Sequence, residues 1–366
     1  CLSAEAAGAP HGSQPIAALK KQNSFAHFRA WGGDLMEKNG ATLVKHFSAL
    51  AYMGFWEVIS HLPTILKNIR LCKQDILNYS PDVIIYIDYP GFNLRIAQGA
   101  KSKGFKNHYY ISPQVWAWKE NRVQKMKQCL DALYVILPFE KPYFEKKHQF
   151  RVHYVGHPLM DYIPKHPIDK TFLFSNLLDE NKPLIPLPPG SRIPALKKML
   201  PLFVEVATQF PNHQFIIAAA PSIPKDYYNQ LIKKTPLKIV YGATYDLLQH
   251  STAALVTSGT ATLETALFKV PQLVCYRSSN LNYWIAKKIL KLKYISLVNL
   301  IVDSKVVLEL IQGACNPKRL EVELRNLLDS QNKGLNEGYQ KLVSLLGSEG
   351  TSNKTADLIY RAISKK

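Results

Sequence analysis

Short runs of consecutive apolar residues alternate with segments of helical periodicity along almost the whole chain. Runs in which every residue is apolar, rather than every second one, are typical of parallel strands covered by helices on both faces. Helical periodicity is clearest at residues 195–210 and 281–292. The predicted strands are residues 83–87, 108–111, 132–137, 152–155, 184–187, 214–219, 239–241, 253–257 and 273–276. The pattern therefore predicts an α/β fold with parallel sheets.

One stretch interrupts this alternation, at residues 164–182, where prolines and a polar run replace the apolar segments. We therefore predict an N-terminal domain of residues 1–166 and a second domain of residues 167–345, each a doubly wound, Rossmann-like sheet. Residues 346–366 form a predicted helix that could pack back on the first domain. Ligands of doubly wound sheets bind beyond the carboxyl ends of the strands. Two such domains facing a cleft describe the GT-B architecture, an analogy of fold from which no function follows.

The composition is that of a globular protein, because 47% of the 366 residues are hydrophobic and 20% are charged. No apolar run approaches the roughly 20 residues needed to span a bilayer. The 5 cysteines are scattered and form no Cys-x-x-Cys pair. This argues against a zinc site or a disulfide framework and for reduced thiols in a cytoplasm.

The net charge of +19 predicts an anionic partner: a nucleic acid, a phosphorylated substrate or an acidic membrane surface. The lysines are dispersed, so most of them are expected to serve an ordinary solvated surface. Nucleic acid is not expected as a partner, because no long basic helix or aromatic and basic platform stands out. A non-catalytic anion-binding protein remains an alternative to an enzyme.

A small-residue turn, Ser258-Gly259-Thr260, follows the predicted strand 253–257 and precedes a predicted helix at 262–268. The backbone amides of such a turn and the positive end of the helix dipole favour an anion such as a diphosphate. Glu264, placed in the first helical turn, could then accept the hydroxyls of a ribose. The alternative is that Ser258 and Thr260 only cap the helix, with Glu264 completing a capping pattern.

Further candidates follow the other strands of the second domain. Gly190-Ser191-Arg192 comes after strand 184–187, and an arginine there can hold phosphate oxygens in a bidentate manner. Tyr276 and Arg277 end the strand beyond Glu264, and Asn299 lies further along the chain. No cluster of metal ligands accompanies these residues, so we expect arginine, helix dipoles and backbone amides to neutralise phosphate without a metal cofactor.

In the first domain, Asp88 ends the predicted strand 83–87. A carboxylate at that end of a parallel strand suits a general base that takes the proton of an attacking hydroxyl. Alternatively, Asp88 caps the turn that follows it. Ser112, Gln114 and Trp116 follow the next strand, where they could contact a sugar or an acyl chain, or lie in the core. His157 follows strand 152–155 and has either a structural role or a contact with substrate.

Apolar residues at positions 55, 58, 59, 62, 65 and 66 form a helical stripe. Pro63 disfavours one continuous helix, so we predict two helical pieces joined at Leu62. As a buried face, the stripe needs no function. As an exposed face, with Trp56 at the interface and lysines nearby, it would be a membrane-docking patch.

The motifs together resemble the lipid-A-disaccharide synthase family over nearly the whole chain. They are residues 87–93, 112–118, 137–140, 155–159, 190–192, 258–264 and 295–299. The resemblance implies a glycosyltransferase of lipid A and lipopolysaccharide biosynthesis, peripheral to the cytoplasmic face of the inner membrane of a Gram-negative bacterium. It implies an inverting, metal-free reaction that joins UDP-2,3-diacylglucosamine to 2,3-diacylglucosamine 1-phosphate (lipid X) through a β(1→6) bond and releases UDP.

Carried over by position, the resemblance makes Asp88 the base that acts on the acceptor's 6-hydroxyl. The implied donor residues are Arg192, Ser258, Gly259, Thr260, Glu264, Tyr276, Arg277 and Asn299. The implied acceptor-side residues are Glu5, Ser112, Gln114, Trp116 and His157. The implied membrane patch consists of Trp56, Val58, Ile59, Leu62, Ile65 and Leu66, and an anionic lipid surface is the expected partner.

The chain departs from the family at its start. In the first turn, residues 4–10, Glu5 and Gly8 keep the family's pattern, but Ala7 and Ala9 stand where a hydroxyl and a carboxylate are expected. We also expect the first strand to be missing from the centre of the first sheet. One alternative is another UDP-sugar enzyme of this architecture, such as a cell-wall N-acetylglucosaminyltransferase or a UDP-sugar epimerase. The other alternative is a chain that binds UDP but has impaired turnover.

Overall fold

The computed structural model describes residues 2–3, 12–46, 61–232, 235, 237–279, 283–284, 292–330 and 332–364. The chain divides into two compact units. The first unit holds residues 1–161 together with 348–366, and the second unit holds residues 162–347. The sequence placed these boundaries after residues 166 and 345, a few residues away in each case.

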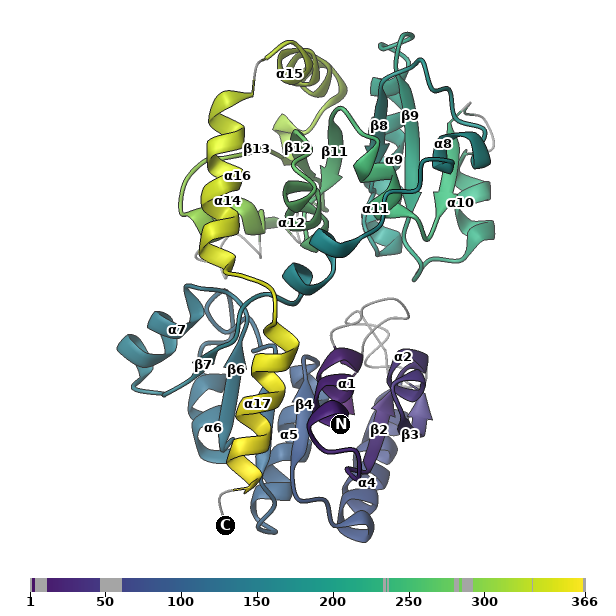
Figure 1. The fold of residues 1–366 in the computed structure, drawn as a ribbon. Coiled ribbons are helices and arrows are strands. Elements are labelled where there is room, and N and C mark those ends of the chain that lie inside the picture. The colour runs from purple at the N-terminus through teal and green to yellow at the C-terminus, as the bar shows by residue number, and fades with distance from the viewer. Residues whose placement is uncertain are drawn as a thin grey trace. The chain divides into compact units, whose positions relative to one another are not determined.

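The first unit is built on a seven-stranded parallel sheet with the strand order β3-β2-β1-β4-β5-β6-β7 (Figure 1). The strands are β1 Leu2–Ser3, β2 Phe28–Gly32, β3 Ala41–His46, β4 Ile84–Ile87, β5 Asn107–Tyr110, β6 Ala132–Val135 and β7 His153–Tyr154. The expectation of a missing first strand is wrong, because β1 pairs with β2 on one side and β4 on the other.

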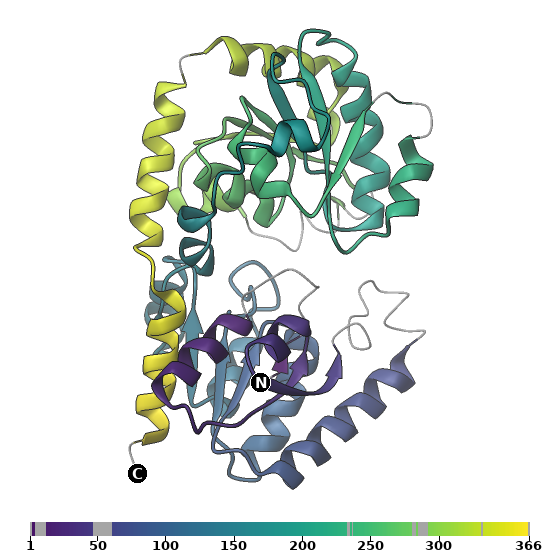
Figure 2. The ribbon, with the colours of Figure 1, turned by 45° about the vertical axis from the view of Figure 1, so that its right-hand side comes forward.

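Helices cover both faces of this sheet, which explains the continuous apolar runs. Tyr86 of β4 belongs to a core shared with α4, α5 and α6, whereas its neighbours Ile85 and Ile87 belong to a core shared with α1 and α17. The C-terminal helix α17 lies beside α1 (Figure 2). The helices are α1 Ser13–Gln22, α2 Asp34–Lys38, α4 Leu62–Tyr79, α5 Pro90–Lys101, α6 Arg122–Cys129, α7 Glu140–Pro142 and α17 Thr351–Ser364, with the π-turn η2 Tyr143–Lys147 and the 3₁₀ turn η3 Pro158–Asp161.

The second unit holds two three-stranded parallel groups, β10-β9-β8 and β11-β12-β13. Their strands are β8 Leu184–Leu187, β9 Gln214–Ala219, β10 Lys238–Tyr241, β11 Ala254–Thr257, β12 Gln272–Tyr276 and β13 Leu308–Ile311. The two groups meet at β8 and β11, where the amide of Thr252 donates to the carbonyl of Leu184 and that of Thr257 to the carbonyl of Pro188. Pro186, in the middle of β8, has no amide to donate. The resulting order β10-β9-β8-β11-β12-β13 is that of the Rossmann fold.

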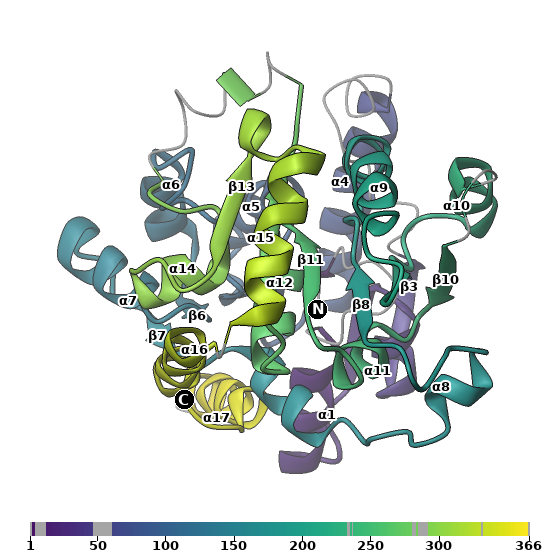
Figure 3. The same cartoon turned by 90° about the horizontal axis from the view of Figure 1, so that it is seen from above.

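The helices of the second unit flank these strands, and α15 lies beside α9 (Figure 3). They are α8 Phe172–Ser175, α9 Ile193–Ala207, α10 Lys225–Ile232, α11 Thr244–Gln249, α12 Thr260–Leu267, α14 Leu297–Val302, α15 Pro317–Asp329 and α16 Lys333–Leu346, with the 3₁₀ turns η4 Ile163–Lys165 and η5 Gln312–Ala314. The predicted helix 195–210 is α9. The predicted helix 281–292 falls almost wholly outside the described residues. Across the part of the chain that the structure describes, no helix is both long and apolar enough to cross a membrane.

Candidate functional site

Each unit has one point at which the strand order reverses, between β1 and β4 in the first and between β8 and β11 in the second. Doubly wound sheets bind their ligands beyond the carboxyl ends of the strands at such a point. In the second unit, the residues that follow β8 lead to Arg192, and those that follow β11 form the 258–260 turn. In the first unit, Asp88 follows β4.

The 258–260 turn leads directly into α12, which begins at Thr260, two residues earlier than predicted. Gly259 is the N-cap with φ 147°, and no side chain caps the helix. The hydroxyl of Ser258 instead donates to the carbonyl of Ile295 at 3.3 Å. The helix-cap interpretation of the turn is therefore wrong. Within the described segments, the amides of Thr260 and Ala261 have no protein acceptor, so this helix terminus is free to bind an anion.

The loop after β8 lies against the same strand end. Gly190 has φ +98°, and a Cβ placed on it would lie 3.4 Å from Cγ2 of Thr257 and from Cβ of Ala195. These are ordinary van der Waals distances, so the positive φ, and not a lack of space, is what favours a glycine here. Arg192, the exposed N-cap residue of α9, follows immediately. The hydroxyl of Ser222 fixes the intervening carbonyl of Ser191 at 3.0 Å. The fold thus brings Arg192 to the strand end that carries the 258–260 turn.

Glu264 lies in the second turn of α12 and not in the first, as was predicted, because the helix begins two residues earlier. Its carboxylate accepts a hydrogen bond of 2.9 Å from the hydroxyl of Tyr245. Burial raises the pKa of Glu264, and the bond from Tyr245 partly offsets this shift by favouring the charged form. Tyr245, on α11, packs against Phe268 with ring centroids 5.2 Å apart. Sequence reasoning missed Tyr245, because nothing near it in the chain indicates a partner 19 residues away.

Two other predicted donor residues have different surroundings. Arg277 is exposed at the end of β12, next to the half-buried Tyr276. Asn299 is fully buried on α14. Its Oδ1 accepts from the amides of Val306 and Val307, and its Nδ2 donates to the carbonyl of Val307 and to Glu309. A side-chain amide offers no further strong bond once both ends are used in this way. This geometry gives Asn299 a place inside the protein and not a direct contact with a ligand.

Asp88 occupies a constrained corner after β4, where both Asp88 and Tyr89 have φ 47°. Its carbonyl accepts from Nδ2 of Asn93 at 2.7 Å and from the hydroxyl of Tyr109 at 2.5 Å. These bonds stabilise a backbone conformation that non-glycine residues rarely adopt. The side chain of Asp88 is exposed at this corner, yet the protein around it displaces enough water to raise the pKa of its carboxyl. The amide of Tyr89 partly offsets that shift.

The predicted acceptor-side residues differ in how deeply they are buried and in whether the protein uses their polar atoms. Ser112 is buried, and its hydroxyl donates to the carbonyl of Pro113 at 3.0 Å. His157 is buried, and its Nδ1 accepts from the amide of Leu159 at 3.2 Å. Gln114 is exposed and Trp116 is half-buried. Of these four side chains, Gln114 is the one that projects most into solvent.

Glu140 lies behind Trp116 and was not singled out as a site residue. It is 1% exposed. Its carboxylate accepts from the amides of Ile136 and Leu137 and from the indole of Trp116. Burial raises the pKa of Glu140 to about 7, although these three donors favour the charged form. The motif at 137–140 was a signal for this residue, but the motif alone does not show that its carboxylate anchors the tryptophan loop.

The remaining predicted residues are Glu5 and the members of the membrane patch, and only some of them belong to the described residues. Glu5, Trp56, Val58 and Ile59 lie outside the described residues. The helix α4 begins at Leu62 with Pro63 in its first turn, as proline prefers. Leu62 and Leu66 are 44% and 45% exposed, whereas Ile65 packs against the core. The patch thus has an exposed pair of leucines in the part that the structure describes.

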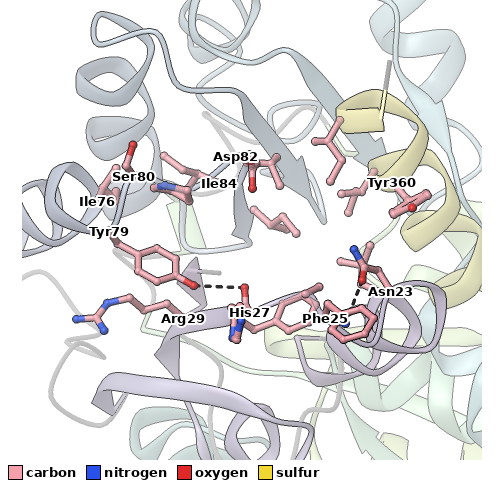
Figure 4. Close-up of a pocket in the computed structure, with 18 of the residues that line it drawn as sticks. Asn23, Phe25, His27, Arg29, Ile76, Tyr79, Ser80, Asp82, Ile84 and Tyr360 are labelled. Atoms are coloured by element: carbon pink, nitrogen blue, oxygen red, sulfur yellow. Dashed lines mark hydrogen bonds between the residues drawn. The ribbon is translucent and has the colours of Figure 1, made fainter. Parts of the chain in front are cut away.

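A cavity of about 510 Å³ lies at the amino-terminal ends of β2 and β4 (Figure 4). Its lining includes Arg29, Tyr79 and Asp82, and the hydroxyl of Tyr79 donates to the carbonyl of His27. None of the predicted site residues lines this cavity, and it lies at the opposite end of β4 from Asp88.

Two Rossmann-type units, with an uncapped helix terminus and an arginine at one switch point, place the chain in the GT-B fold class. The fold resembles a Methanocaldococcus jannaschii UDP-GlcNAc 2-epimerase solved with UDP-GlcNAc and UDP, with a TM-score of 0.65, 14% identity and 96% of each chain covered. The chain belongs to the lipid-A-disaccharide synthetase family, whose sequence profile matches residues 1–362.

Curated relatives agree with this assignment. A lipid-A-disaccharide synthase of Syntrophus aciditrophicus is 34% identical over 373 aligned residues, which cover 100% of this chain and 97% of the relative. One of Geobacter metallireducens is 33% identical with the same coverage. The resemblance inferred from the motifs is therefore confirmed, and the chain is a glycosyltransferase of lipid A biosynthesis.

Proposed function

We propose that the chain transfers the sugar of UDP-2,3-diacylglucosamine to the 6-hydroxyl of 2,3-diacylglucosamine 1-phosphate, with inversion at the donor carbon. The observation that carries this proposal is the uncapped terminus of α12 beside the loop that holds Arg192. That arrangement suits the diphosphate of a UDP-sugar. The family supplies the acylated character of both sugars, and the high basic charge fits substrates that carry phosphate.

On the donor side, the amides of Thr260 and Ala261 would bind phosphate oxygens, and Arg192 would pair with the same group. Glu264 would accept the ribose hydroxyls, because the bond from Tyr245 fixes one carboxylate oxygen and leaves the other available. Arg277 would add positive charge from the end of β12. These contacts stabilise the negative charge that builds up on the departing UDP.

On the acceptor side, Asp88 would act as the general base. As the 6-oxygen forms its bond to the anomeric carbon, the bond from that carbon to the UDP oxygen breaks, and the hydroxyl proton passes to the Asp88 carboxylate. The raised pKa of Asp88 suits this role, because it makes the carboxylate a stronger base than an ordinary aspartate. Asn93 and Tyr109 would keep the carboxylate at this corner by fixing the backbone of Asp88.

We further propose that the exposed leucines of α4 dock the first unit on an anionic membrane surface. Leu62 and Leu66 lie one turn apart, and the exposed cations Lys67 and Arg70 lie on the same helix. Exposed apolar side chains with neighbouring basic ones are typical of helices that bind at a lipid interface. Acylated substrates reside in such a surface, so docking would bring the enzyme to both of them.

A two-substrate reaction tests this function. The protein is incubated with UDP-2,3-diacylglucosamine and 2,3-diacylglucosamine 1-phosphate, and the products are identified by mass. The expected products are the acylated disaccharide 1-phosphate and UDP. Product formed only with a non-acylated acceptor would favour a cell-wall transferase, and conversion of UDP-N-acetylglucosamine without acceptor would favour an epimerase. UDP binding without any product would show that turnover is impaired.

A further inference from the structure

The strand β13 carries two polar side chains that hold loops beside the proposed UDP site. β13 pairs with β12 in parallel, with Glu309 opposite Val274 and Ile311 opposite Tyr276. Its neighbour Leu310 is buried in the core of the second unit, which fixes the strand. Glu309 lies within the strand, and Gln312 follows it at the start of η5.

Glu309 holds the segment that leads into α14. Its carboxylate accepts from the amides of Ile295 and Ser296 at 3.0 and 2.9 Å. It also accepts from the hydroxyl of Ser296 at 2.8 Å and from Nδ2 of Asn299 at 2.9 Å. Glu309 therefore fixes the N-cap residue Ser296, whose hydroxyl in turn caps α14 by accepting from the amide of Asn299 at 3.2 Å.

The segment that Glu309 holds is bonded in turn to the 258–260 turn. The carbonyl of Ile295 accepts the hydroxyl of Ser258 at 3.3 Å. Asn299 connects α14 to the segment before β13, because its Oδ1 accepts from the amides of Val306 and Val307. A continuous chain of hydrogen bonds therefore runs from Glu309 through Ile295 to Ser258. Such satisfied networks hold a loop in one arrangement.

Gln312 holds a second loop in a comparable way. Its Oε1 accepts from the amide of Ser278 at 2.6 Å, and its Nε2 donates to the carbonyl of the same residue at 3.4 Å. Ser278 directly follows Arg277. Gln312 itself has φ 53°, a conformation that costs energy in a non-glycine residue. The side-chain bonds to Ser278 help to compensate for that cost.

We propose that Glu309 and Gln312 are positioning residues for the UDP-sugar, which set the 258–260 turn and Arg277 without touching the nucleotide. Asn299 is part of the same hydrogen-bond network, because it bonds both to Glu309 and to the backbone of Val306 and Val307. This proposal rests on the proposed function, since it requires UDP to bind at the 258–260 turn. It goes beyond that function by assigning the placement of two loops to one strand that carries no predicted site residue.

The test uses Glu309→Gln and Gln312→Ala in the full chain. Glu309→Gln keeps the size of the side chain but turns an amide NH₂ toward groups that are themselves donors. Gln312→Ala removes both bonds to Ser278. UDP affinity is measured by calorimetry, KM is measured for each substrate, and thermal melting of each variant is recorded. Glu321→Gln is the matched control, because Glu321 pairs with Arg325 on the exposed side of α15.

We expect each variant to weaken UDP binding and to raise the KM of the UDP-sugar by about 10- to 100-fold, the scale on which misplaced binding groups act. The KM of the acylated acceptor should change less than about twofold. The Glu321 control should bind UDP as the unmodified chain does. In the double variant with Ser258→Ala, the effect of Glu309→Gln should be smaller than in the single variant, because both act through the same chain of bonds.

UDP affinity unchanged in both variants overturns the proposal. An equal rise in both KM values also overturns it, because that result indicates a general loss of structure. If Glu309→Gln melts below the assay temperature, Gln312→Ala alone decides by the same criteria. Arg192→Ala separates this proposal from the function on which it rests. If Arg192→Ala leaves UDP affinity unchanged, the proposed UDP site is wrong. If Arg192→Ala weakens UDP binding but the Glu309 and Gln312 variants bind UDP as the unmodified chain does, the site is right and the positioning role is wrong.

Discussion

The hydroxyl of Tyr245 donates a 2.9 Å hydrogen bond to Oε1 of Glu264, across 19 residues of sequence. The bond joins α11 to α12 and fixes the orientation of a half-buried carboxylate near the terminus of α12. Burial alone raises the pKa of Glu264, and the tyrosine hydroxyl partly reverses that shift. Tyr245 therefore helps to keep Glu264 ionised and ready to accept hydroxyl groups.

Replacing Tyr245 by Phe should weaken UDP binding through Glu264. A hydrogen bond to a charged group contributes about 1.5–3 kcal/mol, so a partial loss of alignment corresponds to about a tenfold lower affinity. Calorimetric titration with UDP measures the effect. Tyr227→Phe is the control, because the Tyr227 hydroxyl is buried without a bonding partner among the described residues. Equal UDP affinities for Tyr245→Phe and Tyr227→Phe would remove Tyr245 from the site.

Gly190→Ala should destabilise the second unit and weaken UDP binding. The residue has φ +98°, a backbone conformation that is strained for alanine, although the added Cβ would meet its neighbours only at ordinary contact distances. Backbone strain of this kind costs about 1–3 kcal/mol. Urea unfolding and UDP titration measure the two effects. Gly334→Ala on α16 is the control, because a Cβ there has no neighbour within 4 Å. A Gly190→Ala protein as stable as the control would show that the loop does not need a glycine.

Asp88→Asn should reduce turnover by about 100- to 10,000-fold and leave UDP affinity nearly unchanged, because it removes the base and not the donor site. In the unmodified chain, activity should rise with pH as Asp88 loses its proton. Because the pKa of Asp88 is raised, that rise should lie above the pH range of an ordinary aspartate. The pH profile of kcat/KM checks this. Turnover by Asp88→Asn close to that of the unmodified chain would exclude Asp88 as the base.

The buried Glu140 should make the stability of the first unit depend on pH. Its folded pKa is raised from 4.5 to about 7, so the folded state holds a proton that the unfolded state has lost. Between those values, stability should fall as pH rises, by up to about 3 kcal/mol at about 1.4 kcal/mol per unit. Glu140→Gln should lack this dependence, and the exposed Glu37→Gln should retain it. Parallel pH profiles for the unmodified chain and Glu140→Gln would contradict the prediction.

Leu62→Ser with Leu66→Ser should reduce binding to anionic vesicles by about tenfold or more, because each leucine contributes up to about 1.5–3 kcal/mol when fully buried. Sedimentation with phosphatidylglycerol vesicles measures the binding. Leu77→Ser is the control, because Leu77 is 44% exposed near the far end of the same helix. A loss of binding in Leu77→Ser as large as in the double variant would mean that the proposed patch has no special role.

The sequence predicts the strands well where both faces of the sheet are covered, because most of those runs are continuously apolar. Each predicted strand overlaps an observed one to within two residues at either end. The strands β2, β3 and β13 were missed, because they contain polar residues such as Arg29, Lys45 and Glu309. β1 was expected to be missing because the residues before the 4–10 turn are too few for the full first strand of the family, yet Leu2 and Ser3 pair with β2 and β4.

The position of a candidate residue in the fold was predictable where it follows a strand: Asp88 and Ser258 come directly after β4 and β11, and Arg192 ends the loop after β8. The role of a residue was not predictable where it depends on partners that are distant in the sequence. Asn299 was taken as a ligand contact, yet its amide is fully used by Val306, Val307 and Glu309. The spacing of a motif does not show which polar groups the folded backbone satisfies.

The central claim is that backbone amides at the start of α12 bind the diphosphate of UDP. Thr260 is the first residue of that helix, a position that tolerates proline. Thr260→Pro therefore removes one amide donor while the helix remains, and Thr260→Ala removes only the hydroxyl. The decisive measurement is UDP affinity of these two variants by calorimetry. If these amides bind the diphosphate, Thr260→Pro should lose at least about tenfold in UDP affinity, and Thr260→Ala should lose less. UDP binding by Thr260→Pro as tight as by the unmodified chain would contradict the central claim.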